Sequence, residues 1–553
     1  MNDEAEEKTG NIGHTALVFF HGIGNPRKLG TLTTFLDEFD RVGSSQDPQK
    51  LGVPRNFRHK IEEGEDGSSS AVVQFRRIKK FKKIDVQVKI VRAYEGYWGD
   101  DLTRPISMLT FILWILKIVV NSFRILRSPW RRYPLYRIRS LHLVDDMFSG
   151  RLTREKLEAI YRKFGSAKKV DRWKAGTRQD FIAYLESDEV KGTYGDFSAI
   201  AKSWFEREKN VLRSFLFTAT SVLVFAFFML LVVGFLIWST LGVAAEAYSV
   251  PVALHIPAAV SIYALFLWLA WSPVKQRISD VYFWTSYDER SNGFSIRERR
   301  IDQAERLIQK VIKNDRCNDC VIVAHSLGSA IATEAFFRIS DKIDALDISD
   351  EERECRRRQF QKIRFMFVAG SPIDNIFSLF QESYVPSRRY SRIQEQKSAS
   401  FKRDHFYPSF AMVNIWSRFD PISARILSLR TPENRRNKMV FNSESVPSGI
   451  PAPLAAHSGY FQDEAIMTEI YRAVMTGRFN PQNMRAEYLE VELGRWKYIS
   501  FLGLPLCIIM VIGASLFEIR LLSAGSLVAL GGLLYFTLKK YASDVKEQAE
   551  CRS

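Results

Sequence analysis

Residues 320–328 read Cys-Val-Ile-Val-Ala-His-Ser-Leu-Gly and carry the clearest indication of the fold. The β-branched run before Ser326 predicts a buried parallel strand, and the small residues from Gly328 to Ala332 predict the start of a helix. Where a strand passes sharply into a helix, the turn strains the serine and exposes its hydroxyl above the sheet edge. Such turns often carry Gly at the position of Ala324, and alanine is still a small residue that fits the turn. An ordinary strand-to-helix turn is the alternative interpretation.

A glycine-rich turn near the N-terminus is the second feature. Residues 15–20 read Thr-Ala-Leu-Val-Phe-Phe, which predicts a strand, and they run directly into His21-Gly22-Ile23-Gly24. A loop of this kind after an early strand can aim a backbone N–H at an oxygen that becomes negatively charged during a reaction. Together with the serine turn, it indicates a site for nucleophilic chemistry.

A nucleophilic serine needs a base and an acid, and few residues qualify. Of the eight histidines, only His405 and His457 follow Ser326. In folds with this turn the chain order is nucleophile, acid, histidine. Residues 410–416 predict a strand that leads to Asp420, so we expect Asp420 to be the acid and His457, in the following loop, to be the base. His405 precedes that strand and is expected to be a surface histidine.

Asp374 is the alternative acid. It follows a predicted strand at 363–368 and the turn Gly370-Ser-Pro372. It lies one strand earlier than Asp420, so it ranks second.

Four motifs together resemble the α/β-hydrolase superfamily, especially its membrane-associated serine lipase and esterase branches, including bacterial ones. They are His21-Gly-Ile-Gly24, Ala324-His-Ser-Leu-Gly328, Ala369-Gly-Ser-Pro-Ile-Asp374 and Phe419-Asp-Pro-Ile422. The Tyr-Glu-Gly-Tyr-Trp segment that ends at Trp98 is similar to a segment of bacterial hydrolases of this kind. The resemblance covers roughly residues 1–105 and 280–480.

This resemblance implies an α/β fold whose mostly parallel sheet is flanked by helices. It makes Ser326 the nucleophile, Asp420 the acid and His457 the base. It also implies that the backbone N–H of Leu327 and one from the Gly22–Gly24 loop, with Ile23 as first choice and Gly22 as its neighbour, stabilise the oxyanion.

Four stretches carry no Asp, Glu, Lys or Arg, and each is long enough to cross a bilayer as a helix. They are 214–245, 247–274, 498–517 and 521–538. They predict two transmembrane hairpins, one inserted in the α/β domain and one appended to it. Lys and Arg flank both hairpins, whereas the two hairpin turns together carry one Arg (Arg520) and no Lys, which predicts a cytoplasmic catalytic domain on a bacterial inner membrane.

Residues 106–123 are a fifth apolar stretch, interrupted by Lys117 and followed by several arginines. If His21 and Ser326 share one site, the chain between them crosses the membrane an even number of times. The hairpin at 214–274 supplies two crossings. We therefore expect 106–123 to lie in the membrane interface or be buried in protein.

The predicted domain organisation is one core, interrupted once. Its parts are the N-terminal part of the core (1–105), an interfacial helix and helical cap (106–213), a hairpin (214–274), the C-terminal part of the core (275–497), a second hairpin (498–538) and a cytoplasmic tail (539–553).

The charge balance favours an anionic membrane surface as a partner. The formal net charge is +17, and the basic residues recur in clusters. No aromatic-interleaved nucleic-acid motif accompanies them, so no nucleic-acid partner is expected. Cys317 and Cys320 have the spacing of a zinc or redox pair, but without a second pair core packing is favoured. No metal or cofactor is expected.

These features predict an integral-membrane serine hydrolase of the lipase or esterase type. It would cleave lipid or other hydrophobic acyl esters through an acyl-enzyme intermediate. The alternative is a non-catalytic, membrane-anchored hydrolase-like module that binds a partner or transmits a signal.

Overall fold

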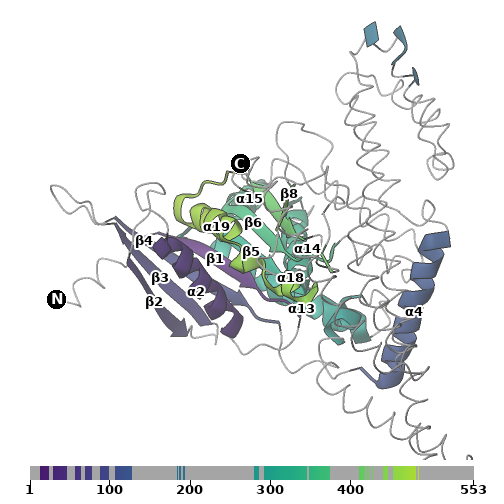
Figure 1. The fold of residues 1–553 in the computed structure, drawn as a ribbon. Helices are drawn as coiled ribbons and strands as arrows, with labels where there is room; N and C mark the ends of the chain where they lie inside the picture. The colour runs from purple at the N-terminus through teal and green to yellow at the C-terminus, as the bar shows by residue number, and fades with distance from the viewer. Residues whose placement is uncertain are drawn as a thin grey trace, which may run out of the picture.

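In the part of the chain that the structure describes, eight strands form one sheet in the order β2-β3-β4-β1-β5-β6-β7-β8 (Figure 1). Each neighbouring pair from β4 to β8 is parallel, whereas β2–β3 and β3–β4 are antiparallel. The computed structural model describes residues 13–23, 29–45, 56–63, 69–77, 87–98, 106–127, 279–285, 292–344, 348–373, 410–417, 440–445 and 453–480, with isolated positions at 183–192, 420–426 and 484.

The strands are β1 (His14–Phe20), β2 (Asn56–Glu63), β3 (Ser69–Arg77), β4 (Gln87–Gly96), β5 (Cys317–His325), β6 (Ile363–Ala369), β7 (Ala411–Trp416) and β8 (Val440–Glu444). The helices are α2 (Gly30–Ser45), α4 (Met108–Arg127), α13 (Asn292–Lys313), α14 (Leu327–Asp341), α15 (Asp350–Phe360), α18 (Pro453–Ser458) and α19 (Glu464–Thr476), with 3-10 turns η1 (Lys342–Asp344) and η4 (Tyr460–Gln462). The expected α/β class, a mostly parallel sheet flanked by helices, is confirmed.

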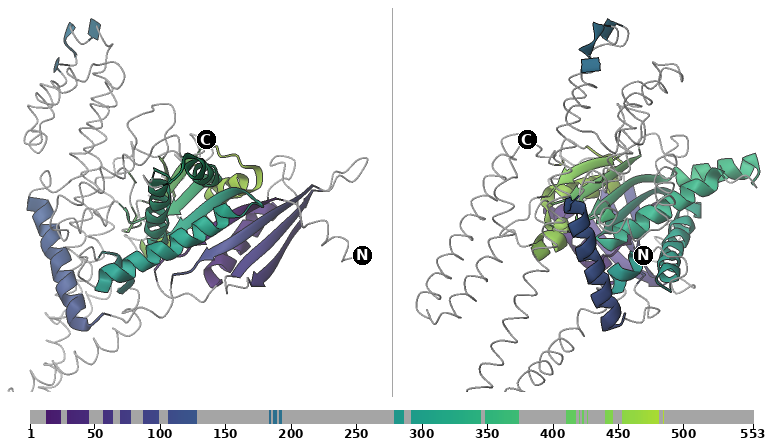
Figure 2. Two further views of the ribbon diagram at one scale, coloured as in Figure 1. Left: turned by 180° about the vertical axis from the view of Figure 1, so that it is seen from behind. Right: turned by 90° about the vertical axis from the view of Figure 1, so that its right-hand side faces the viewer.

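The central strand β1 is buried on both faces, and its residues alternate between two cores. Ala16, Val18 and Phe20 join one cluster. Leu17 and Phe19 join the other. This alternation follows from the two-residue period of a strand. Helices α13 and α14 cover the first face, and α2 and α19 cover the second (Figure 2, left).

The strands come from both sides of the predicted interruption. β1 pairs with β4 on one side and with β5, some 300 residues later, on the other. The two core segments expected at 1–105 and 275–497 therefore contribute to one sheet.

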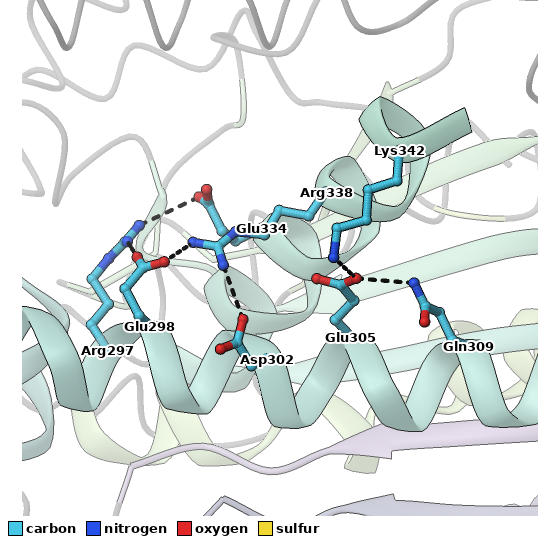
Figure 3. A network of polar contacts seen from close by, with 8 residues as sticks. All are labelled: Arg297, Glu298, Asp302, Glu305, Gln309, Glu334, Arg338 and Lys342. Atoms are coloured by element: carbon cyan, nitrogen blue, oxygen red, sulfur yellow. Dashed lines mark hydrogen bonds and ion pairs between the residues drawn. The ribbon is translucent and has the colours of Figure 1, made fainter. Parts of the chain in front are cut away.

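A polar network joins α13 to α14, the helix that follows the serine turn (Figure 3). Arg338 of α14 forms ion pairs with two residues of α13, Glu298 and, at 3.2 Å, Asp302. Lys342, in η1 directly after α14, forms an ion pair with Glu305 of α13, which also accepts a hydrogen bond from Gln309. Arg297 of α13 forms ion pairs with Glu298 at 2.7 Å and with Glu334 of α14 at 3.5 Å. These contacts hold the two helices in register over the sheet.

The four predicted transmembrane stretches lie outside the described residues, as does nearly all of the predicted cap within 106–213 beyond α4. Among the residues that the structure does describe, none forms a helix with the length and apolarity needed for a membrane span. The fifth apolar stretch, 106–123, forms most of α4.

Candidate active site

The carboxyl ends of the parallel strands gather the candidate residues at one edge of the sheet, as expected for an α/β sheet. His21–Ile23 follow β1, Trp98 follows β4, Ser326 follows β5, Gly370 follows β6 and Asp420 follows β7. Residues distant in sequence thus meet because their strands are neighbours.

Ser326 forms a strained turn between β5 and α14. Its backbone has φ 52° and ψ −127°, a region in which non-glycine residues are rare. Such strain typically costs about 1–3 kcal/mol and persists only where the surroundings enforce it. Here the Ser326 N–H donates to the Ala369 carbonyl at 2.8 Å, and the Ser326 carbonyl accepts from Ser329 N at 3.0 Å. The strained conformation predicted for the serine turn is present.

The structure brings Ser326, His457 and Asp420 into one hydrogen-bonded chain. The Ser326 hydroxyl lies 2.8 Å from His457 Nε2. His457 Nδ1 lies 2.8 Å from Asp420 Oδ2. With Nδ1–H donating to the carboxylate, Nε2 is free to accept the serine proton.

His457 lies in the short helix α18 rather than in a loop. Gly370 makes room for its ring. Gly370 has φ +63°, and a Cβ there would lie 3.2 Å from His457 Cε1 and 2.9 Å from Tyr460 Cε2. Glycine at position 370 is therefore required by both the backbone conformation and the close approach of the histidine.

Asp420 is held as a carboxylate. Burial by itself raises its pKa, but hydrogen bonds from His457, Tyr460 and the Ile422 N–H outweigh that effect, so the pKa lies below its ordinary value. The Tyr460 hydroxyl donates to Oδ2 at 2.7 Å, and Ile422 N donates to Oδ1 at 2.8 Å. The carboxylate side chain is fully buried. An ionised Asp420 can therefore orient and stabilise a protonated His457.

Tyr460 stays protonated at the base of this site. Burial and the neighbouring Asp420 carboxylate raise its pKa well above its ordinary value. Its hydroxyl also lies 2.9 Å from Ser423 Oγ, so Ser423 can supply a hydrogen bond while Tyr460 donates to Asp420.

His325 holds the backbone of α18, the helix that carries His457. Its Nε2 lies 2.8 Å from the His457 carbonyl, which requires Nε2–H to donate. Burial lowers the pKa of His325 to about 4. The imidazole is therefore neutral near pH 7 and acts as a hydrogen-bond donor, not as a cation.

The glycine-rich loop after β1 lies directly against the serine turn. A Cβ at Gly22 would lie 2.9 Å from Ser326 Cβ, and one at Gly328 would lie 2.2 Å from the His21 carbonyl oxygen. Both glycines are needed for this approach. Leu327 is the first residue of α14, so its N–H has no partner within the helix and is available to an oxyanion. Ile23 packs, partly buried, against the adjoining core cluster.

His21 anchors that loop. Its Nδ1–H donates to the Gly22 carbonyl at 2.8 Å, and its ring stacks on Trp98 with centroids 4.6 Å apart. Trp98 Nε1 donates to the His21 carbonyl at 3.1 Å, and the Arg300 guanidinium covers the Trp98 ring. Burial lowers the pKa of His21 to about 4, so this stack carries a neutral histidine.

The remaining predicted residues stand apart from this arrangement. Asp374, the alternative acid, and His405 lie outside the described residues. Cys317 and Cys320 are free thiols in β5, and burial raises the pKa of Cys317 to about 11. Across the described ranges, no cluster of side chains suits a metal ion.

Sequence reasoning missed the supporting roles of Tyr460, His325 and Trp98. Each role depends on contacts with residues far away in the chain: Tyr460 with Asp420, His325 with His457, and Trp98 with His21. An aromatic three residues after the predicted base was the one local signal for Tyr460.

The chain matches no protein-family model, no curated protein and no solved structure. Fold and site thus define the class by themselves: an α/β protein with a Ser-His-Asp arrangement at the carboxyl edge of a mostly parallel sheet.

Proposed function

We propose that the protein is a serine hydrolase of the α/β-hydrolase type that cleaves hydrophobic acyl esters, including lipid esters. One observation carries the proposal: a strained serine whose hydroxyl lies 2.8 Å from a histidine that is itself 2.8 Å from a buried carboxylate. Each element of this arrangement matches a requirement of covalent acyl transfer.

In the proposed reaction, Ser326 Oγ attacks the acyl carbonyl while His457 Nε2 accepts the serine proton. The carbonyl oxygen becomes negatively charged and is stabilised by the N–H of Leu327 and an N–H of the Gly22–Ile23 loop. Losing one such donor typically costs about 10²–10³ in rate. Asp420 stabilises the imidazolium through Nδ1–H.

The tetrahedral intermediate then expels the alcohol, which takes the proton from His457. This leaves an acyl group on Ser326. A water molecule, deprotonated by His457, attacks the acyl-enzyme and forms a second tetrahedral intermediate. When this intermediate collapses, the carboxylic acid is released and Ser326 takes back the proton from His457. The cycle uses no metal or cofactor.

We further propose that the enzyme is an integral membrane protein with its catalytic domain in the cytoplasm. The uncharged stretches at 214–245, 247–274, 498–517 and 521–538 have the composition of membrane spans, and basic residues flank them.

Hydrolysis of an ester panel tests the proposal. Purified full-length protein in detergent should hydrolyse p-nitrophenyl esters, with longer acyl chains favoured over acetate. Ser326→Ala and His457→Ala should each lose at least about 10³-fold in kcat. A folded wild-type protein with no activity above that of Ser326→Ala across ester, thioester and amide substrates would instead support a non-catalytic binding module.

A further inference from the structure

The exposed apolar surface of the described chain is concentrated on one helix. All six of its large exposed hydrophobic side chains belong to α4: Leu109, Ile112, Leu113, Leu116, Val120 and Phe123, each between 45% and 66% exposed. Their spacing of three and four residues places them on one face. We call this face the α4 stripe. A contiguous apolar face of this kind marks an interaction surface.

The opposite face of α4 is fixed to the α/β domain. Ile118 is buried in the core cluster, and Trp114 Nε1 donates to Thr285 Oγ1 at 3.2 Å. Just before the helix, Ile106 N donates to Ser279 Oγ at 3.0 Å. The α4 stripe is therefore held in a set orientation on the outside of the domain, and the ribbon views place α4 at the margin away from β2 and β3 (Figures 1 and 2).

The charged residues of α4 and of the sequence on either side of it point to an anionic bilayer as the occupant. From residue 102 to residue 144 the sequence contains eight Lys or Arg residues and no Asp or Glu. Lys117 is exposed on α4 itself, and Arg124 and Arg127 belong to its last turn. An apolar stripe on a segment that carries cations and no carboxylate from 102 to 144 matches acyl chains beneath anionic headgroups.

The buried face of α4 belongs to a core cluster that also reaches the candidate active site. Ile118 of α4 shares a core cluster with Trp98, which holds the oxyanion loop through His21, and Ile23 packs against the same cluster. The helix that carries the α4 stripe is therefore connected through this core cluster to the glycine-rich loop beside Ser326.

We propose that α4 lies in the surface of an anionic bilayer with the α4 stripe among the acyl chains, and that the substrate is an acyl ester resident in that bilayer. The second half of this statement rests on the proposed hydrolase function. The first half does not, and it is tested without catalysis.

The test is depth-dependent fluorescence quenching on the full-length chain in vesicles of phosphatidylcholine and phosphatidylglycerol. With Cys355, Cys507 and Cys551 replaced by Ser and the buried Cys317 and Cys320 kept, Leu113→Cys or Leu116→Cys supplies the one accessible thiol for an NBD label. The matched control places the label at Glu351, an exposed position on α15. We expect lipids with spin-labelled acyl chains to quench the α4 labels strongly and the Glu351 label little, and aqueous iodide to show the reverse order.

Equal iodide quenching at all three positions would overturn the proposal. So would α4 labels that are shielded in lipid-free amphipol as well as in vesicles, because another segment or a second copy of the chain would then cover the stripe. Chemical cross-linking in amphipol distinguishes coverage by another segment of the same chain from coverage by a second copy. The Ser326→Ala background must give the same quenching, so a failed hydrolase assignment leaves this result standing.

A variant tests the source of the substrate. Leu113→Glu/Leu116→Glu should hydrolyse a soluble short-chain ester within about twofold of wild type but lose at least about tenfold on an acyl ester embedded in vesicles. Thr33→Glu/Thr34→Glu, which adds the same charges to the exposed face of α2, should keep both activities. Equal loss on both substrates, or no loss on either, would contradict a bilayer-resident substrate.

Discussion

Gly328→Ala is expected to increase the distance between the glycine-rich loop (His21–Ile23) and the serine turn by a small, defined amount. A Cβ at position 328 would lie 2.2 Å from the His21 carbonyl oxygen and 2.8 Å from that of Phe20. Both neighbours are backbone atoms, so no side-chain rotation relieves the overlap. To reach ordinary contact, the His21 carbonyl must retreat by about 1 Å, and a misplacement of that size typically costs about 10² in rate.

The same movement also weakens a hydrogen bond of the glycine-rich loop. The His21 carbonyl accepts from Trp98 Nε1 at 3.1 Å, so the retreat weakens the hydrogen bond that anchors the glycine-rich loop. We expect kcat/KM to fall by about 10²–10³, which is the cost of one oxyanion donor. As a barrier this is about 2.7–4 kcal/mol.

Two readouts identify this effect. kcat/KM on a soluble p-nitrophenyl ester and the rate of inactivation by a fluorophosphonate should fall together, since both require the oxyanion site. Asp341→Ala, at the exposed end of the same helix, is the control and should remain within about twofold of wild type. If Gly328→Ala keeps more than about a third of wild-type kcat/KM, the close approach of loop and turn is not needed for catalysis.

Three further outcomes are expected. Tyr460→Phe removes a charge-assisted hydrogen bond from the Asp420 carboxylate and should lower kcat about tenfold or more, measured with the melting temperature as a control for folding; unchanged kcat would show that the tyrosine does not support the acid. Asp420→Asn should lower kcat at neutral pH by about 10⁴ while Asp374→Asn stays within about threefold, and the reverse pattern would make Asp374 the acid. The pKa values of His21 and His325 are lowered to about 4 in the folded protein, so below about pH 6.5 the unfolded chain binds more protons than the folded one. The melting temperature in detergent should therefore fall as the pH drops from about 6.5 toward 4. A melting temperature that is flat over this range would contradict the burial of both histidines as neutral groups.

The central strands were predictable because most of their residues are buried on both faces, so each strand reads as a mostly apolar run. The structure places strands at His14–Phe20, Cys317–His325, Ile363–Ala369 and Ala411–Trp416, within a few residues of the stretches expected from sequence. The serine turn was predictable because its small residues leave a local pattern.

The antiparallel edge of the sheet had no comparable signal. β2 reads Asn-Phe-Arg-His-Lys-Ile-Glu-Glu, and its charged residues hide the strand from a search for apolar runs. Its place comes from pairing with β3, which in turn pairs with β4. That is tertiary information.

The candidate site was predictable only where chain order constrains it. Two histidines follow Ser326, and two strand ends carry a candidate acid, Asp420 and Asp374. Chain order ranked Asp420 and His457 first without three-dimensional knowledge. The donors to Asp420 and to the His457 carbonyl lie on other elements, and no spacing rule connects Tyr460 or His325 to those partners.

For α4, the sequence predicted the helix and its composition but not which of its faces is buried. The sequence indicated an apolar helix with a basic continuation at 106–123. Which of its faces is buried depends on contacts with residues 279–285, more than 150 positions later. The structure therefore defines the α4 stripe, whereas the sequence defines only its composition.

The most direct test of the central claim is mapping of the covalent adduct formed by a fluorophosphonate on the folded full-length protein. The Ser326–His457–Asp420 chain predicts one adduct per molecule on Ser326, detected by mass spectrometry of the peptide that contains it, with no labelling of Ser326→Ala and greatly slowed labelling of His457→Ala. An unreactive folded wild type, or an adduct on a residue other than Ser326, would contradict it.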